Sequence, residues 1–360
     1  MRKEPRMPAV IELTKYFEAS DANSRGTLFA GAGKEYGEGK IYRSEDRGET
    51  WREIFDIPVD HKPNAVRVCF VDSRDYIFIG ALERLYRSKD DGKTWEPVFD
   101  FPPGSHEPWA VDEDPHGGIY VGSHGNNSRI FKTPDGGDAW GEVTGPWSSK
   151  HSHDIKCSHE TGWVYAVLEH PQLRPGTTGR QGLNGRGALP GRLSRFLRRY
   201  LKQGSGTPGI WRSKDGGKTW TYIVRGGRYK IGFAVDGETC LIGTEHSGST
   251  NRIYRFIDDG SEGPFKPTIV HTFPSSYGQP VTAGRVIRES ADLRYVFSTG
   301  NTAGPTGTAH IVGSIDGFNW EIIDSKASVS PRRSFYFLSH HHRGGYIYAC
   351  KHPRGIAIRI

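Results

Sequence analysis

Histidine is the residue type in this chain whose placement most directly suggests chemistry. An imidazole titrates near neutral pH, so it can take or give a proton, and in its neutral form it can bind a metal. Five histidines flank short apolar segments at matching positions along the chain: His106, His124, His153, His170 and His246. Their repetition predicts a shared functional site rather than isolated surface histidines.

Basic and polar residues follow at comparable positions later in the chain, and we expect them to bind substrate or take part in catalysis. They are Arg228, Tyr229, Arg285, Asn301, Arg333 and Lys351. Glycoside hydrolysis normally needs two opposed carboxyl groups, and no such pair stands out. Glu107, Asp154 and Glu169 are direct sequence neighbours of histidines, and neighbours along a strand point to opposite sides.

A site of His, Tyr, Arg and Lys suits β-elimination on a uronic acid. A cation neutralises the uronate carboxylate and stabilises the enolate-like charge that develops beside it. A His or Tyr removes the carbon-bound proton next to that carboxylate, and an acid protonates the leaving oxygen. The sequence therefore predicts a polysaccharide lyase, without deciding which residue is the base and which the acid.

A repeated turn motif predicts the elements that must position these side chains. Five copies follow the pattern Ser/Thr-x-Asp-x-Gly-x-x-Trp, the last one residue shorter, and they begin at Ser44, Ser88, Thr133, Ser213 and Ser314. The Asp can cap backbone amides of a tight turn, the Gly supplies an unusual backbone conformation, and the Trp packs over the hairpin. Such an Asp-box joins the third and fourth strands of a four-stranded unit, and its recurrence every ~40–50 residues is typical of propeller blades.

Reading outward from each box predicts an all-β fold, a single seven-bladed β-propeller over residues 1–360, with six blades as the alternative. The blades are expected at about 10–55, 65–99, 106–143, 153–224, 229–272, 281–323 and 333–360. The last unit has only three strands. We therefore expect the N-terminal segment to supply its outer strand and close the ring without a free edge.

One segment, 171–208, does not read as part of a blade. It holds seven Arg and one Lys, no acidic residue, and apolar residues spaced as one face of a short basic helix over 192–202. This basic insertion within blade four is either a mobile solvated loop or a lid over a polyanion. It lies between the second and third strands of its blade, which puts it on the same face as the histidines.

Composition narrows the class of partner. The net charge of +7 favours an acidic partner, and the 47 Gly and 22 Pro fit many short strands joined by turns. The sequence contains no run of 18 apolar residues, so we predict no membrane span. No export signal is visible at the N-terminus, so the protein is expected to be secreted if a signal was trimmed and cytoplasmic otherwise. We expect a monomer that binds an anionic polysaccharide or oligosaccharide.

The cysteines and the remaining histidines give little support for a metal. Cys69, Cys157, Cys240 and Cys350 are far apart and are expected to be small buried hydrophobes rather than a disulfide framework. The run 340–342 is expected in the loop between the first two strands of the last blade, as a polar turn or a metal site. The sequence requires no cofactor, although ligands converging from different blades would allow a calcium or zinc ion.

These motifs resemble known proteins at two levels. The boxes are similar to those of the Asp-box repeat superfamily, which includes sialidases, xyloglucanases, sortilin-type receptors and photosystem assembly factors, and which is specific for fold but not for function. The paired histidines followed by a Tyr resemble the seven-bladed propeller lyases that cleave ulvan or rhamnose–glucuronate linkages. That resemblance implies catalytic His106 and His124, with Tyr229 as proton donor or base and Arg285 as carboxylate partner.

Two other functions stay open. A non-catalytic propeller could bind an anionic glycan or nucleic acid, although pure anion binding would favour Arg and Lys over His. Nucleic acid is less favoured, because the insertion offers only Phe196 and Tyr200 for stacking. A sialidase-like glycoside hydrolase is also less favoured, because no Phe/Tyr-Arg-Ile-Pro segment precedes the first box.

Overall fold

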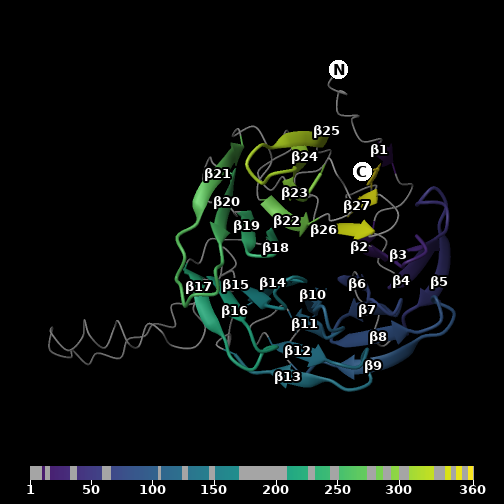
Figure 1. The fold of residues 1–360 in the computed structure, drawn as a ribbon. Helices are drawn as coiled ribbons and strands as arrows, with labels where there is room; N and C mark the ends of the chain where they lie inside the picture. The colour runs from purple at the N-terminus through teal and green to yellow at the C-terminus, as the bar shows by residue number, and fades with distance from the viewer. Residues whose placement is uncertain are drawn as a thin grey trace, which may run out of the picture.

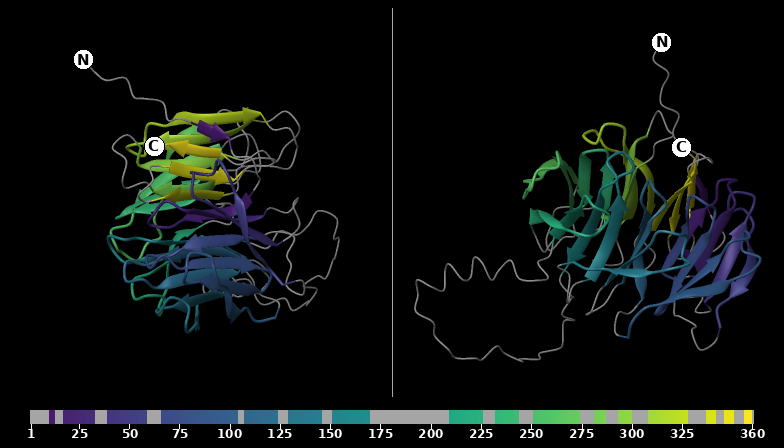
Figure 2. Two further views of the ribbon diagram at one scale, coloured as in Figure 1. Left: turned by 90° about the vertical axis from the view of Figure 1, so that its right-hand side faces the viewer. Right: turned by 60° about the horizontal axis from the view of Figure 1, so that its bottom comes forward.

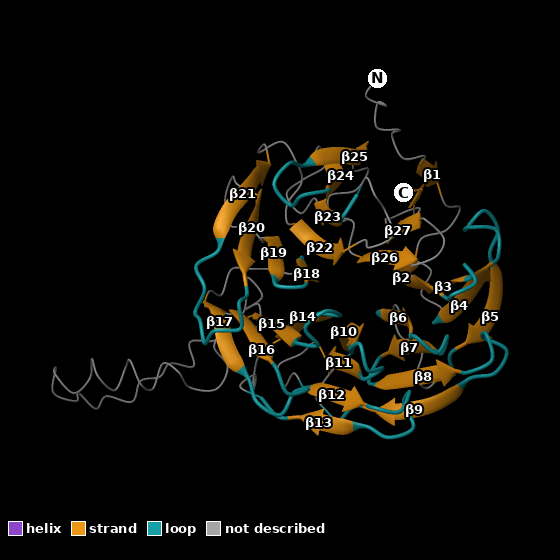
Figure 3. Ribbon diagram, viewed as in Figure 1, coloured by secondary structure: helices purple, strands orange, loops and turns teal. Residues whose placement is uncertain are grey.

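The structure is a computed structural model of the chain. It describes residues 10–12, 17–32, 39–58, 66–103, 107–123, 129–145, 151–169, 209–225, 232–243, 251–273, 281–286, 293–299, 308–327, 337–341, 346–350 and 356–359. The regular structure of these residues is all β, with strands joined by turns and loops (Figure 3). Among them no helix is long and apolar enough to cross a membrane.

The described strands form seven antiparallel sheets of four strands each. The sheets stand side by side around a common centre (Figure 1), and the innermost strand of each contacts the innermost strands of its two neighbours, so the ring is continuous. Figure 2 shows the ring from the side, with strands running across its thickness. Strand ends therefore lie on the two faces of the ring, where side chains from different sheets can meet.

Each sheet has the same order from the centre outward. The innermost strands are β2 (Phe17–Ala22), β6 (Val68–Val71), β10 (Pro108–Glu113), β14 (His151–Cys157), β18 (Phe233–Asp236), β22 (Val281–Val286) and β26 (Phe337–His341). The second strands are β3 (Leu28–Ala32), β7 (Ile77–Ala81), β11 (Ile119–Ser123), β15 (Val164–Glu169), β19 (Thr239–Gly243), β23 (Tyr295–Thr299) and β27 (Tyr346–Cys350).

The outer half of each sheet follows the same rule. The third strands are β4 (Lys40–Ser44), β8 (Arg84–Ser88), β12 (Ile130–Thr133), β16 (Gly209–Ser213), β20 (Asn251–Ile257), β24 (Thr308–Ser314) and β28 (Ile356–Arg359). The outermost strands are β5 (Arg52–Asp56), β9 (Glu96–Asp100), β13 (Gly141–Val143), β17 (Thr221–Arg225), β21 (Thr268–Phe273), β25 (Glu321–Ala327) and β1 (Val10–Glu12).

The N-terminal strand closes the ring, as the sequence predicted. β1 pairs antiparallel with β28, with Val10 opposite Ile358 and Glu12 opposite Ile356. The predicted start of the first blade at residue 10 is therefore wrong. That blade begins with β2 at Phe17, because residues 10–12 complete the sheet formed by the C-terminal strands.

The Asp-box turns have the chemistry expected of them. In the second box the Ser88 hydroxyl accepts the Gly92 N–H at 2.9 Å, while Asp90 accepts the Thr94 N–H at 2.8 Å and the Thr94 hydroxyl at 2.7 Å. The Trp95 indole N–H also donates to the Gly92 carbonyl at 3.1 Å. The turn thus satisfies its own polar groups and fixes the ring of the tryptophan.

Four of the five boxes also pack on the preceding sheet through their glycine. Gly92 has φ of 82°, and a Cβ atom there would lie 2.6 Å from Ile54 Cδ1 in the first sheet. A Cβ atom on Gly137, whose φ is 94°, would lie 2.9 Å from Phe78 Cε1 in the second sheet. Glycine is therefore required at this position for both its backbone conformation and its lack of a side chain.

A basic residue directly before the box Ser interlocks neighbouring sheets. The guanidinium of Arg43 pairs with Asp91 of the second box at 2.5 Å. Arg87 pairs with Asp138 of the third box at 2.7 Å. Arg212 pairs with Asp258 in the turn that replaces a box in the fifth sheet, and it donates to the Ser261 carbonyl at 2.8 Å.

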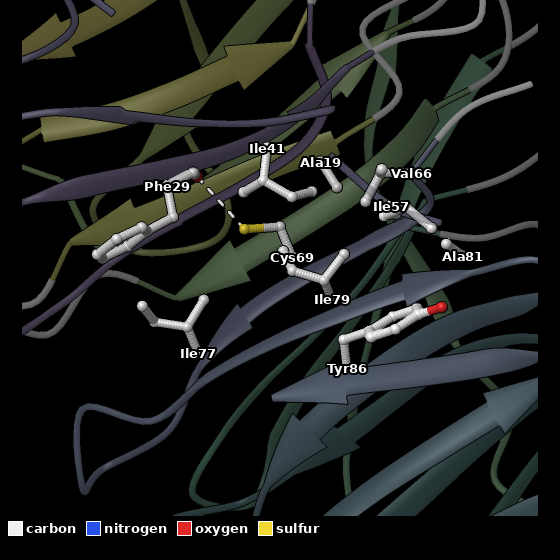
Figure 4. Packing of buried hydrophobic residues seen from close by; sticks show 10 residues of the cluster. All are labelled: Ala19, Phe29, Ile41, Ile57, Val66, Cys69, Ile77, Ile79, Ala81 and Tyr86. Carbon is white, nitrogen blue, oxygen red and sulfur yellow. Dashed lines mark hydrogen bonds between the residues drawn. The ribbon is translucent and has the colours of Figure 1, made fainter. Parts of the chain in front are cut away.

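Apolar clusters fill the space between adjacent sheets. Figure 4 shows the cluster between the first two sheets, where residues such as Phe29 and Ile41 meet Ile77 and Ile79. Cys69 lies in this cluster, and its thiol donates to the Phe29 carbonyl at 3.3 Å. Cys69, Cys157 and Cys240 are buried free thiols, which confirms that prediction for three of the four cysteines.

The predicted position of the histidine run was wrong for two of its members. His340 and His341 are the last residues of β26, opposite Ile347 and Tyr346, rather than loop residues. The strand runs further than expected because the ladder between β26 and β27 continues to the Tyr346 pair. His342 lies outside the described residues.

We predict that breaking the Arg212–Asp258 pair destabilises the ring strongly. Both side chains are almost fully buried, at 2% and 0% exposure, so Arg212→Met leaves a buried carboxylate without its cation. The free energy of unfolding in urea should fall by about 3–5 kcal/mol. Arg84→Met is the matched control, because Asp100, its partner, is 65% exposed, and its loss should cost about 1 kcal/mol or less. Equal losses of unfolding free energy for the two variants would show that this buried pair does not hold the two sheets together.

A second prediction concerns acid stability. The hydrogen bond from the Thr94 hydroxyl, helped by the Thr94 N–H and the Ser88 hydroxyl, lowers the pKa of Asp90 to about 2. The unfolded chain titrates this carboxyl near about 4. Asp90 therefore contributes stability that is present above about pH 4 and is lost as the pH falls through about 2. Unfolding titrations at several pH values should show a smaller decline across this window for Asp90→Asn than for the wild type.

The control for this titration is Glu83→Gln, which removes an exposed carboxylate from the turn between β7 and β8. It should leave the pH dependence unchanged. If Asp90→Asn and the wild type lose stability in parallel as the pH falls, the hydrogen bonds to Asp90 do not stabilise the turn.

Candidate functional site

The candidate site lies on one face of the ring, where innermost strands begin and second strands end. We call it the entry face, and the opposite face, which carries the box turns, the Asp-box face. The connection from β15 to β16 leaves the ring on the entry face. That connection contains the basic insertion predicted at 171–208, which itself lies outside the described residues.

Most of the predicted site residues also lie outside the described residues. They are His106, His124, His170, Arg228, Tyr229, His246, Asn301, Arg333 and Lys351. The structure gives the strand positions of the other two. His153 lies in β14 near the entry face, whereas Arg285 pairs with Val296 and is the last residue but one of β22, toward the Asp-box face.

A repeated irregularity in the innermost strands marks the entry face. Four of these strands carry a one-residue bulge near their start, where the pairing with the second strand shifts. The residues outside the ladder are Glu18 in β2, Trp109 in β10, His153 in β14 and Thr282 in β22. Bulges are frequent next to active sites, where they change the direction of a side chain and end regular pairing.

The bulges add residues that the sequence analysis missed. Glu18 was missed because the innermost strand of the first sheet was placed at residue 10 instead of Phe17. Trp109 was not singled out, although it follows the His106–Glu107–Pro108 segment directly. The alternation of apolar residues at Phe17 and Ala19 could have located the strand around Glu18.

The best described part of the entry face joins the second and third sheets. The guanidinium carbon of Arg67 lies 5.1 Å from the centroid of the Trp109 ring, and Arg67 Nε lies 3.3 Å from Glu107 Oε2. Arg67 precedes β6 and Glu107 precedes β10, so the cluster stands at the start of both strands. All three side chains are partly exposed, so a cation and an aromatic ring are accessible on the entry face.

The carboxylate next to His153 is neutralised within the protein. Lys156 Nζ lies 2.6 Å from Asp154 Oδ1, and both residues are buried. Their partners across the sheet, Tyr165 and Val167, pack toward the fifth sheet. Since Asp154 is held by this ion pair, it is not placed to act as one of the two opposed carboxyl groups that glycoside hydrolysis requires.

The described residues contain no group of three or more His, Cys, Asp and Glu side chains that could hold a metal ion. A calcium or zinc ion in the site therefore stays a prediction. The chemistry assigned to the site does not depend on one.

Comparisons with known proteins agree with the arrangement of the sheets in a ring. The sequence profile of the BNR-Asp box repeat matches residues 41–54, which include the first box. Virginiamycin B lyase from Staphylococcus aureus superposes with a TM-score of 0.62 at 13% identity, covering 98% of this chain and 99% of that one. The chain is a β-propeller with Asp-box repeats.

Two further structures show the same propeller architecture. YCF48 bound to D1 peptide has a TM-score of 0.60 at 13% identity, covering 100% of this chain and 96% of that one. An ancestral GH74 enzyme has a TM-score of 0.62 at 12% identity, covering 94% of this propeller and 44% of that chain. No curated protein sequence matches significantly. At these identities the likeness establishes the fold alone.

We predict that the contact beside the His153 bulge is intolerant of added volume. A Cβ atom at Gly122, near the entry-face end of β11, would clash with Ser152 Oγ and lie 2.9 Å from Ser152 Cβ. Gly122→Ala should therefore lower the free energy of unfolding by about 1–3 kcal/mol. Gly141→Ala is the matched control, because a Cβ atom there would meet nothing within 4 Å. Urea unfolding that shows equal stability for the two variants would disprove the close packing.

Proposed function

We propose that the chain is a seven-bladed propeller whose entry face carries a polysaccharide lyase for uronate-containing glycans. The observation that supports the proposal is the shared bulge register: His153 has the same strand position in its sheet as Trp109, and Trp109 contacts Arg67. An acid–base residue and a cation are groups that elimination on a sugar acid requires, and Trp109 adds a flat aromatic surface. The basic net charge of +7 favours the same anionic substrates.

The reaction assigned to this face is β-elimination. A neutral His or a Tyr removes the proton from the carbon next to the uronate carboxylate, and the electron pair forms a carbon–carbon double bond. The bond to the 4-oxygen breaks, and an acid gives that oxygen a proton. We assign proton transfer to His106, His124, His153, His170 and Tyr229, and glycan binding to Arg228, His246, Asn301, Arg333 and Lys351.

Two described residues extend this assignment. Arg67 is held by Glu107 against Trp109, and we assign it to bind a uronate carboxylate on the entry face. Glu18 occupies the bulge of the first sheet, at the same strand position that His153 has in the fourth. Arg285 stays a predicted carboxylate partner, although its strand position is nearer the Asp-box face.

A non-catalytic propeller that binds an anionic partner is the second candidate. It is favoured by the net charge of +7 and by the structural likeness to YCF48, which was solved bound to a peptide. Such a protein would use Arg67 and the basic insertion to hold its partner. It would leave the partner chemically unchanged.

The lyase is tested by the ultraviolet absorbance of the unsaturated uronate product on a panel of uronate polysaccharides. We expect turnover by the wild type, and a loss of about 100-fold or more in His153→Ala and in His124→Ala. The matched control is His116→Ala. His116 is exposed in the turn between β10 and β11 on the Asp-box face, so this variant should keep full activity.

The two candidates give different results in this assay. Glycan binding without product in the wild type would favour the binding propeller and exclude the lyase for that panel. Turnover that survives in His153→Ala and His124→Ala would move the chemistry away from the entry-face histidines. Absence of both binding and turnover would contradict the lyase and a propeller that binds these glycans.

A further inference from the structure

The Asp-box of the sixth sheet, which is the fifth copy in the chain, differs from the other four in its surface. Ile315 and Phe318, both 50% exposed, stand where the other boxes carry mostly charged residues. At the position of Ile315 the other boxes have Glu45, Lys89, Pro134 and Lys214, and at that of Phe318 they have Glu49, Lys93, Asp138 and Lys218. The turn itself is intact, because Ser314 accepts the Gly317 N–H at 2.9 Å. The apolar residues therefore cannot be explained by the needs of the turn.

A further exposed apolar residue and an arginine extend this surface onto the fifth sheet. The guanidinium carbon of Arg255 lies 4.7 Å from the centroid of the Phe318 ring. Ile257, which is 41% exposed, is two residues further along β20, so its side chain lies on the same side of the strand as that of Arg255. We call Arg255, Ile257, Ile315 and Phe318 the box-six patch.

Unlike the arginines that pair with a carboxylate of a neighbouring sheet, Arg255 has no carboxylate partner among the described residues. Its guanidinium donates to the Thr239 hydroxyl at 3.5 Å, and its Nε atom is buried without a hydrogen-bond partner among those residues. By contrast, Arg43 pairs with Asp91 and Arg294 with Asp236, each at 2.5 Å. The box-six patch thus combines three exposed apolar side chains with a cation that lacks a counter-charge.

Nearby carboxylates are engaged in their own turns. Asp316 accepts the N–H groups of Phe318 and Asn319, each at 2.8 Å, and Asp259 accepts the Ser261 N–H at 2.9 Å. These bonds hold both carboxylates within their turns and lower the pKa of each. An incoming carboxylate is therefore the group that would complete the surroundings of Arg255.

We propose that the box-six patch docks a segment of a partner protein in which an Asp or Glu is flanked by apolar side chains. The carboxylate would pair with Arg255, and the apolar side chains would cover Phe318, Ile315 and Ile257. Exposed aromatic and arginine side chains in one cluster are typical of the residues that dominate protein–protein affinity. The patch lies on the Asp-box face, so this proposal is independent of the lyase on the entry face.

Charge disfavours a second copy of this chain as the occupant. In a two-fold contact the same patch meets itself, so Arg255 would face the Arg255 of the other copy. The chain as a whole carries a net charge of +7, which adds to the repulsion. A segment with acidic residues removes both obstacles.

The test is selection of a displayed library of random peptides on the full chain, with counter-selection on Phe318→Lys. Lys occupies this position in two other boxes, so the variant should fold. We expect enriched peptides to carry Asp or Glu beside Leu, Ile or Phe. Synthetic versions should lose binding about tenfold or more when the acidic residue is changed to its amide, and also on Arg255→Gln. Lys93→Ala, at the matching position of the second box, should bind as the wild type does.

The position of the bound peptide can be measured by NMR from the methyl resonances of the isoleucine side chains. Those of Ile257 and Ile315 should shift on titration, and that of Ile54 in the first sheet should not. Enrichment without acidic residues, equal binding to Phe318→Lys, or no enrichment at all would overturn the proposal. A concentration-dependent dimer that Phe318→Lys abolishes would replace it with self-association.

Discussion

The ring depends on contacts between Asp-box turns and the sheets before them, which four of the five boxes make through their glycine. Hydrogen bonds from the box Ser and Asp hold the turn, and the box glycine then lies against an apolar side chain of the preceding sheet, as Gly92 does on Ile54. The cation before the box reaches forward into the next turn, as Arg43 does to Asp91. A local turn motif thereby sets the spacing and angle between neighbouring sheets. Because every sheet contacts two others, these contacts close a ring only if they repeat with the same geometry.

As a result, the two faces of the ring are built differently. The Asp-box face is built from turns whose polar groups are satisfied internally, and Arg43, Arg87 and Arg212 pair there with the next sheet. The entry face has no comparable motif in its described part, and its regular feature is the bulge in four innermost strands. Apart from close contacts such as that of Gly122 with Ser152, the residue types there are not dictated by a repeated turn. That freedom is why we assign chemistry to the entry face and recognition of a partner to the one box whose surface departs from the rest.

The Asp-box of the sixth sheet shows how far the motif can change before its structural role is lost. It is one residue shorter, yet the Trp320 indole N–H still donates to the Gly317 carbonyl at 3.2 Å. In the fifth sheet the motif has decayed, but Asp258 still receives Arg212 from the fourth. The interlock therefore survives without the full box. The exposed positions around it can then be used for other contacts.

The amino-acid sequence by itself determined the repeated unit of this protein. The box residues predicted where third strands end and fourth strands begin, because a tight turn with a glycine at positive φ and a capping carboxylate has a strong local signature. It also predicted that the N-terminal segment would complete the last sheet, since a ring with a free edge is disfavoured. The start of the first sheet was misplaced, because short apolar segments around Val10 and Phe17 look alike and only pairing with β28 distinguishes them.

Only the tertiary structure decided which residues share a register at the entry face. Bulges depend on pairing between strands, so Glu18, Trp109, His153 and Thr282 could not be grouped from local sequence. The stacking of Arg67 on Trp109 joins residues of different sheets and has no sequence pattern of its own. The same holds for Arg255 and Phe318, whose contact joins the fifth sheet to the sixth. Local turns are encoded by neighbours in the chain, whereas sites between sheets arise only when the ring brings distant residues together.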